Sequence, residues 1–253
     1  MWRKLRFVMF AMAVVALPLL LVNGCAEKLP TEGETEEFSQ SVDDGSRQFY
    51  DTDDIGDQVL VSADLINAIG QRQHAQALAD GKQGSATAWQ LYVYVPFVSQ
   101  NDSRWKNHSL GYNYDGRSTI GKYGCLLSCL TMHYKKWGYN IDPRTLNNWS
   151  KFGQDHYAFS TCCNGDRIHS THAISYPNMS RPWRVISYDE IYPQLAAGRP
   201  VVMYLYLGNN NYHFVVIYGF DGTRYWCKDP WRTSSYNQPL FGQSVQARIY
   251  GYQ

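Results

Sequence analysis

The feature that most constrains the fold is a pair of apolar, β-prone runs in the C-terminal third of the chain, Val201 to Leu207 and His213 to Tyr218. Only the turn-forming stretch Gly208 to Asn211 separates them, so they predict an antiparallel hairpin of two buried strands. Asp221-Gly222 predicts a further turn, which leads into a third strand around Tyr225 to Cys227.

The segments that precede the hairpin have helical periodicity instead. Gly124-Cys125 opens a stretch of apolar residues at the spacing of a mostly buried helix. Asp142-Pro143 is typical of a helix start, and Ser187-x-x-Glu190 is a capping box for another helix, which Gly198 ends. Helices early and antiparallel strands late predict an α+β fold.

The composition is that of a chain with a real core. Hydrophobic residues make up 44% of the 253 residues and charged residues only 18%, which excludes wholesale disorder. The formal net charge is +1, so the chain lacks the basic excess of a nucleic-acid-binding protein. We therefore expect no nucleic-acid partner.

The N-terminus has the pattern of a secretory signal. Met1 to Arg6 is short and basic, and Phe7 to Val22 is apolar but too short for a comfortable membrane span. Gly24 before Cys25 resembles a bacterial lipoprotein cleavage box, in which the cysteine becomes lipidated. The alternative is an uncleaved membrane anchor. Either interpretation predicts an extracytoplasmic location in the bacterial cell envelope, periplasmic or at the cell surface, with the membrane as a partner.

A solvated spacer follows this signal. Between Ala26 and Leu60 there are eleven acidic residues and two basic ones, which predicts a segment that cannot bury a core. Leu60 to Asp80 has helical spacing with Ser62 as its cap. It could dock on the main domain or form a propeptide-like arm, but we favour a local helix with no role. The expected domains are a signal peptide at 1–24, a lipid-anchored acidic linker at 25–87 and a folded domain at 88–253.

Four residues of the folded domain suit acyl-transfer chemistry. Cys125 stands at a helix N-terminus, where the helix dipole favours the nucleophilic thiolate. His213 starts a strand and could take the thiol proton, and Asp229 could then hold the imidazole ring. Gln100, ahead of the nucleophile, offers an amide donor for an oxyanion. Each residue alone is more often structural, so it is the ordered set that predicts a thiol enzyme.

These residues lie in stretches that resemble the C39-like peptidase family, bacterial relatives of the bacteriocin-processing cysteine peptidases with a papain-like fold. The stretches occur in the family's order and together cover about residues 90 to 232. They are Val95-Pro96 to Gln100, Asp102-x-Arg104-Trp105, Tyr123 to Ser128, Asp142-Pro143-x-x-Leu146-Asn147, Gly198 to Val202, Tyr212 to Val216, and Lys228-Asp229-Pro230.

The resemblance implies a membrane-anchored cysteine peptidase that acts on a protein or peptide substrate. Cys125 would be the nucleophile, His213 the base, Asp229 the residue that orients the imidazole and Gln100 the oxyanion donor. The reaction would pass through a thioester and would require no metal or organic cofactor. The fold would place the nucleophile on a helix in an N-terminal helical part and the His and Asp on a C-terminal antiparallel sheet.

The remaining cysteines are candidates for disulfides. Without Cys25 and Cys125, four cysteines remain, and outside the cytoplasm an even number suggests two disulfides: Cys129, Cys162, Cys163 and Cys227. A rival pairing is Cys129 with Cys125, one helical turn away, in an oxidised and inactive form. A metal site at Cys162, Cys163, His169 and His172 is a further rival, although that spacing matches no common zinc pattern.

Two other functions fit the same residues. One is an amidase or transglutaminase-like acyl transferase that acts on cell-wall peptides. The other is a non-catalytic binding module that keeps the fold and holds Cys125 in a structural disulfide.

Overall fold

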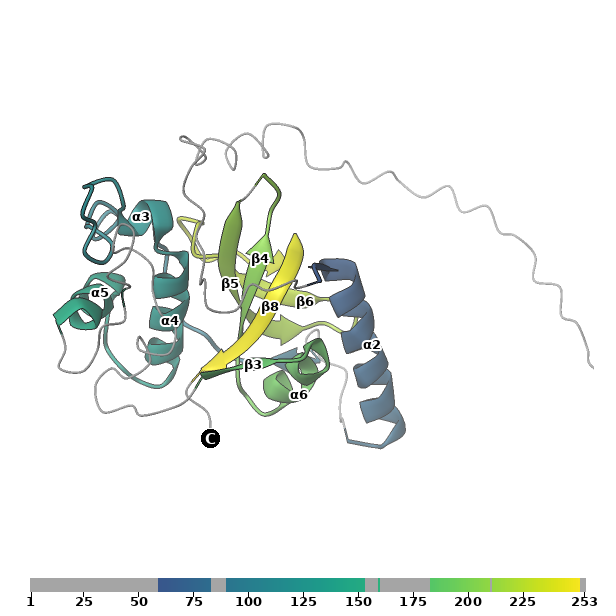
Figure 1. Cartoon of the computed structure of the whole chain (residues 1–253). Coiled ribbons are helices and arrows are strands. Elements are labelled where there is room, and N and C mark those ends of the chain that lie inside the picture. Colours follow the sequence, from purple (N-terminus) through teal and green to yellow (C-terminus); the bar gives the residue numbers. More distant parts are fainter. Residues whose placement is uncertain (1–58, 83–89, 153–158, 160–182, 210, 251–253) are drawn as a thin grey trace, which may run out of the picture. The chain divides into compact units, whose positions relative to one another are not determined.

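A computed structural model describes residues 59–82, 90–152, 159, 183–209 and 211–250 (Figure 1), all within the compact unit formed by residues 42–253. Its centre is an antiparallel sheet with the strand order β1-β8-β4-β5-β6-β7, in which β2 also pairs with β5 and β3 with β8. The strands are β1 (Val61–Ser62), β2 (Leu91–Tyr92), β3 (Trp183–Ile186), β4 (Val201–Tyr206), β5 (Tyr212–Phe220), β6 (Tyr225–Lys228), β7 (Gln238–Pro239) and β8 (Gln243–Tyr250).

The hairpin expected from the sequence is the β4–β5 pair. Its register runs from Val201 opposite Ile217 to Tyr206 opposite Tyr212, and the backbone N–H of Leu207 donates to the carbonyl of Asn211 at 2.8 Å to close the turn. Both strands are almost entirely buried, as expected of continuous apolar runs. β6 then pairs with β5, so the third predicted strand is also present.

The helices are α2 (Ala63–Ala79), α3 (Ile120–Tyr123), α4 (Cys125–Lys136), α5 (Pro143–Phe152), the 3₁₀ turn η1 (Tyr188–Glu190) and α6 (Ile191–Ala196). In Figure 1, α3, α4 and α5 lie on one side of the sheet and α2 and α6 on the other. The predicted starts of α5 and η1 are confirmed: the Asp142 carboxylate accepts from the Thr145 N–H at 2.6 Å, and Ser187 and Glu190 form the capping box. The α+β prediction, with helices early and an antiparallel sheet late, is confirmed.

The helix before residue 88 is docked on the domain. The Ser62 hydroxyl caps α2 at the Leu65 N–H, and Ile66 is fully buried. The Asn67 side chain accepts from the backbone N–H of Tyr225 at 2.9 Å. A Cβ added at Gly70 would lie 2.7 Å from the Tyr225 hydroxyl, so only glycine permits this approach. The structure has the docked helix, which was not the interpretation that the sequence favoured.

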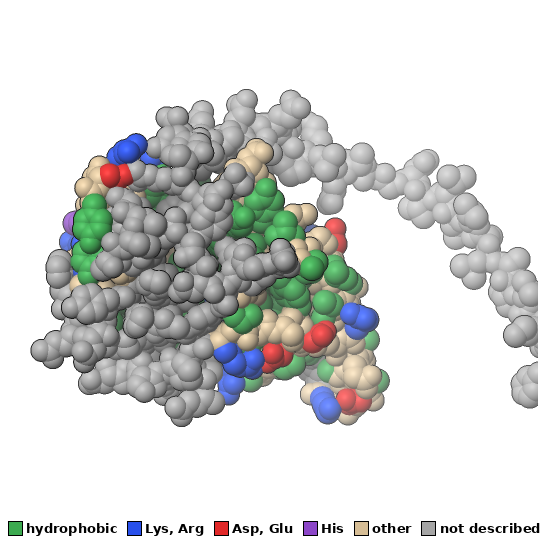
Figure 2. All heavy atoms as spheres, viewed as in Figure 1, with side chains coloured by type: hydrophobic (Ala, Val, Ile, Leu, Met, Phe, Trp, Pro, Cys, Tyr) green, Lys and Arg blue, Asp and Glu red, His purple; other side chains and the backbone are tan. Residues whose placement is uncertain are grey.

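Charged side chains at the surface are paired locally. Figure 2 shows acidic groups beside basic ones on the face it displays. Among the exposed pairs are Arg104 with Asp102 at 2.6 Å and Arg117 with Asp115 at 3.3 Å. Exposed pairs of this kind add at most about 1 kcal/mol each, so the apolar core holds the fold together. Within the described part of the chain, no helix is both long and apolar enough to cross a membrane.

Candidate active site

A glycine between two helices places Cys125 at a helix N-terminus. The short helix α3 ends at Gly124, and α4 begins at the next residue, Cys125. A Cβ at Gly124 would lie only 2.5 Å from the carbonyl oxygen of Ile120, so no larger residue fits at this junction. The first turn of α4 therefore presents the thiol at the positive end of the helix dipole, as the sequence predicted.

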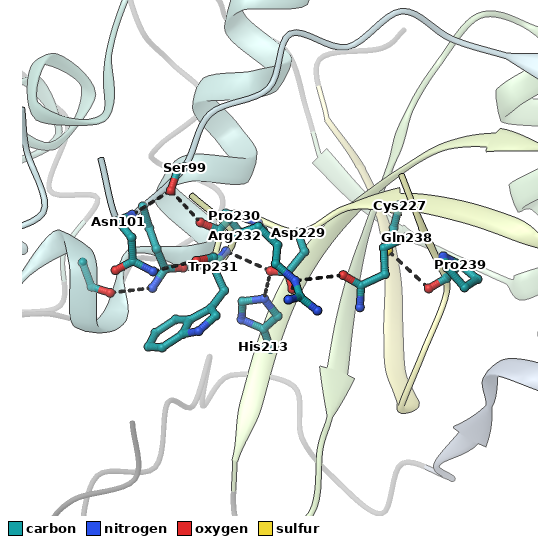
Figure 3. A network of polar contacts seen from close by, with 12 residues as sticks. Ser99, Asn101, His213, Cys227, Asp229, Pro230, Trp231, Arg232, Gln238 and Pro239 are labelled. Carbon is teal, nitrogen blue, oxygen red and sulfur yellow. Dashed lines mark hydrogen bonds and ion pairs between the residues drawn. The ribbon is translucent and has the colours of Figure 1, made fainter. Parts of the chain in front are cut away.

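His213 and Asp229 meet from neighbouring strands. His213 is the second residue of β5, and Asp229 directly follows β6. The pairing of Val216 with Lys228 brings the chain after β6 back toward the start of β5. There the His213 Nε2 lies 2.6 Å from the Asp229 Oδ1 (Figure 3). Both residues are at least 95% buried, so water hardly screens this contact.

The electrostatics of this pair favour a charged imidazole. Burial lowers the pKa of His213, but the Asp229 charge and hydrogen bond, together with a hydrogen bond to the Cys125 thiol, raise it to about 10. Burial raises the pKa of Asp229, yet the neighbouring His213 and the Trp231 N–H bring it below its ordinary value. Since Asp229 occupies Nε2, the nitrogen left for Cys125 is Nδ1.

Gln100 and Asp229 are the least exposed of the four predicted residues, and each is 1% exposed. Its side-chain Nε2 donates to the carbonyl oxygen of Gly121 at 2.8 Å. This acceptor fixes the orientation of the amide, because only the NH₂ end can face a carbonyl. One hydrogen of the NH₂ group is therefore bonded to Gly121, four residues before Cys125 in the sequence, and the second is left for another acceptor.

The predicted residues are joined by contacts that sequence reasoning missed. The side chain of Asn101 donates to the Trp231 carbonyl at 2.7 Å, and the Trp231 N–H donates to the Asp229 Oδ1 at 2.8 Å (Figure 3). Asn101 lies directly beside the predicted oxyanion donor, and Trp231 lies two residues beyond the predicted acid. That adjacency was the one signal in the sequence that could have pointed to them.

The disulfide prediction is not supported among the described cysteines. Cys125, Cys129 and Cys227 are all free thiols, so the structure has neither the Cys125–Cys129 bridge nor a bonded Cys129 or Cys227. Cys129 and Cys227 are fully buried, and burial raises the pKa of each well above its ordinary value. They behave as small apolar core residues instead of cross-links.

Several predicted residues lie outside the described part of the chain. They are Cys25, with the signal peptide and the part of the linker up to residue 58, and Cys162, Cys163, His169 and His172. Within the described ranges, no group of three or more His, Cys, Asp or Glu side chains is arranged to hold a metal ion.

The structure thus brings together a thiol at a helix N-terminus and a buried His–Asp pair beside an antiparallel sheet. The model of the Peptidase_C39 like family matches residues 92–249, and the chain belongs to this family. A solved structure described as a C39-like peptidase from Bacillus anthracis is 18% identical, with a TM-score of 0.42 over 64% of this chain and 98% of that one. No curated protein matches the chain.

Proposed function

We propose that this chain is a cysteine peptidase that hydrolyses peptide bonds through Cys125, His213 and Asp229. The observation that carries the proposal is the buried 2.6 Å contact of His213 Nε2 with Asp229, which leaves Nδ1 to the thiol. A thiolate next to an imidazolium is the reactive form of such enzymes. Membership of a peptidase family supports a protein or peptide as the substrate.

In the first half of the proposed reaction, the Cys125 Sγ bonds to the carbonyl carbon of the scissile peptide. The carbonyl oxygen becomes an oxyanion, which the Cys125 backbone N–H and the remaining N–H of Gln100 stabilise. The C–N bond then breaks as His213 gives its Nδ1 proton to the leaving amine. A thioester between Cys125 and the acyl half of the substrate remains.

In the second half, His213 is neutral and acts as the base. It takes a proton from a water molecule, whose oxygen bonds to the thioester carbon. The C–S bond breaks, the carboxylic acid leaves, and Cys125 returns to the thiolate beside the imidazolium. Asp229 holds the ring in one orientation throughout and stabilises its positive charge.

Cleavage of a mixed peptide library, with mass spectrometry of the products, tests the proposal. Cys125→Ala should lower kcat/KM by at least about 10³-fold, because no other group replaces the nucleophile. Cys129→Ala is the matched control, since Cys129 lies one turn further along the same helix, is fully buried and should leave activity within a few-fold.

Equal activity of the wild type and the Cys125→Ala variant would refute the proposed nucleophile. Cleavage of amide bonds in cell-wall fragments, with no cleavage of any library peptide, would instead support the amidase or acyl-transferase alternative. Complete lack of turnover, together with binding of an intact peptide, would support the binding module.

We also propose that the protein is an extracytoplasmic lipoprotein, anchored through Cys25. The support is the sequence pattern alone: a basic start, an apolar run and a small residue before the cysteine. In a bacterial host, the wild type should fractionate with membranes and carry a diacylglyceryl mass on its N-terminal peptide. Cys25→Ala should lose that mass, whereas an unmodified N-terminus in the wild type would contradict lipidation.

A further inference from the structure

Two loops of the candidate site, residues 99–101 and 229–231, are joined by hydrogen bonds (Figure 3). The backbone N–H of Gln100 donates to the Pro230 carbonyl at 2.7 Å, and the Asn101 side chain donates to the Trp231 carbonyl at 2.7 Å. The first loop carries the proposed oxyanion donor and the second carries the proposed acid. The two loops therefore form one connected unit although they are about 130 residues apart in the chain.

The peptide group between Pro230 and Trp231 connects this contact to the acid. Its C=O accepts from Gln100, and its N–H donates to the Asp229 Oδ1 at 2.8 Å. Because a trans peptide is planar, its C=O and N–H point in opposite directions, and fixing one end aims the other. The same Asp229 Oδ1 contacts His213 Nε2, so the plane of this peptide determines where the carboxylate can meet the imidazole.

Asn101 fixes the next peptide group in the same loop. With Gln100 it immobilises the peptides on both sides of the Trp231 Cα, which a single hydrogen bond could not do. Asn101 is itself held, since its backbone N–H donates to the Ser99 hydroxyl at 3.0 Å. The Ser99 carbonyl in turn accepts from the indole N–H of buried Trp105 at 2.7 Å.

We propose that Asn101 is a positioning residue, which holds the 229–231 loop so that Asp229 orients His213. The inference rests on the proposed peptidase function. Its chemical requirement is a neutral donor of this length, because an ionised carboxylate would face the partial negative charge of the Trp231 carbonyl and an alanine would remove the donor. Among the described residues, Asp229 and Cys125 act on the charge of His213, and Arg232 lies 4.0 Å from the other Asp229 oxygen.

Kinetics of the full chain on a cleaved peptide test this role. Asn101→Ala should lower kcat roughly 10- to 100-fold with KM nearly unchanged, because the orientation of reacting groups suffers more than substrate binding. The alkaline limb of its pH profile should move to lower pH, since a loosened carboxylate stabilises the imidazolium less. Asn107→Ala, an exposed asparagine in the same loop region, is the control and should match the wild type.

Asn101→Asp separates positioning from general loss of stability, because it preserves the shape of the side chain. Its kcat should fall further than that of Asn101→Ala at pH 7.5 and recover partly toward pH 4, where about half of the new carboxyl groups are protonated and can donate. Equal kcat and an equal alkaline limb in the wild type and both variants would overturn the proposal.

A measurement that needs no turnover distinguishes this failure from failure of the peptidase proposal. In the Cys125→Ala background, the NMR titration of His213 should shift to lower pH by about one unit when Asn101→Ala is added. An unshifted titration would overturn the positioning role whether or not the chain is a peptidase. A shifted titration in a chain without peptidase activity would leave the positioning intact and reject only the proposed reaction.

Discussion

A buried histidine lies near each end of α4, and the pKa values of the two histidines are shifted in opposite directions. His213 lies at the N-terminal end, next to Cys125, and its pKa is raised to about 10. His133 belongs to the third turn of the same helix, and its pKa is lowered to about 3. Exposure does not explain the difference, since His213 is 5% exposed and His133 is 0% exposed.

The pKa difference between the two histidines comes mainly from one carboxylate. Burial is the main influence on the pKa of His133. The centroid of its ring lies 5.6 Å from that of Trp137 and 5.9 Å from that of Tyr250. Among the described residues, neither ring nitrogen has a hydrogen-bond partner. Burial acts on His213 in the same direction, but Asp229 reverses it. The core alone thus makes neutral imidazoles, and it is the loop after β6 that makes the charged one.

Asp229→Asn should remove this difference and have the largest effect. His213 would then resemble His133, with burial in control and its pKa below the ordinary value, so the imidazolium that the thiolate needs would be absent at neutral pH. We expect kcat/KM to fall at least about 10²-fold. The pH–rate profile provides the measurement, and exposed Asp115→Asn provides the control.

The same variant has a stability signature of fixed sign. The folded-state pKa of His213 lies above its ordinary value, so the charged pair stabilises the fold fully below about pH 6.5 and this contribution is lost as the pH rises toward 10. Asp229→Asn should therefore cost more stability at pH 6 than at pH 9.5 in urea unfolding. An equal cost at both pH values would mean that the imidazole is uncharged in the wild type.

His133→Leu sharpens the comparison from the other end of α4. The folded-state pKa of His133 is depressed, so the unfolded chain takes up a proton near pH 6.5 while the folded chain does not until about pH 3. The free energy of unfolding therefore falls as the pH drops from about 6.5 to about 3, because protonation of His133 favours the unfolded chain. Urea unfolding at pH 7.5 and 4.5 should show an acid loss smaller by about 2 kcal/mol in the variant.

The control for this prediction is exposed His108→Gln, which should lose as much stability on acidification as the wild type. An identical acid loss in all three proteins would indicate that His133 becomes protonated in the folded chain. In that case its ring would have a polar partner, and the two ends of α4 would differ less than the geometry implies.

Local patterns in the sequence were sufficient for the elements around the site. The glycine before Cys125, the Asp142-Pro143 start and the capping box at Ser187 each depend on residues within one turn, and the structure has all three. The β4–β5 hairpin was predictable for the same reason, since a short turn joins two apolar runs.

Long-range pairing was not predictable in the same way. β8 was not predicted, although its alternation of polar and apolar residues is typical of a strand with one face in solvent. That pattern does not predict the burial of Ser244, Gln246 and Arg248. β8 pairs with β1, β3 and β4, all distant in sequence, and no local pattern predicts these pairs. The link from Asn101 to Trp231 was missed for the same reason, as it spans 130 residues and follows no periodicity.

The roles of the individual site residues stay predictions for a different reason. The sequence supplied the order Gln100, Cys125, His213 and Asp229, and the structure adds their contacts. Contacts describe a resting arrangement, whereas a catalytic role is defined by what changes along a reaction. Only the variants and pH profiles above connect the two.

Cys129 lies midway between the two ends of α4 and provides the smallest effect. As a free, fully buried thiol, it should contribute only its packing, so Cys129→Ala should cost about 1 kcal/mol in the free energy of unfolding. Urea unfolding of the wild type and the variant, each with and without reductant, isolates this residue from every other cysteine. The cost should be the same in both conditions.

A disulfide at Cys129 would give a different pattern. Its loss typically costs about 2–5 kcal/mol, so the variant would be much less stable than the wild type without reductant, and reductant would bring the two together. That outcome would restore the cross-link expected from the even cysteine count. A difference in the free energy of unfolding that is the same with and without reductant would instead show that Cys129 is an apolar core residue, as His133 is a neutral one. Cys125 would then be the single thiol of α4 that faces a charged imidazole.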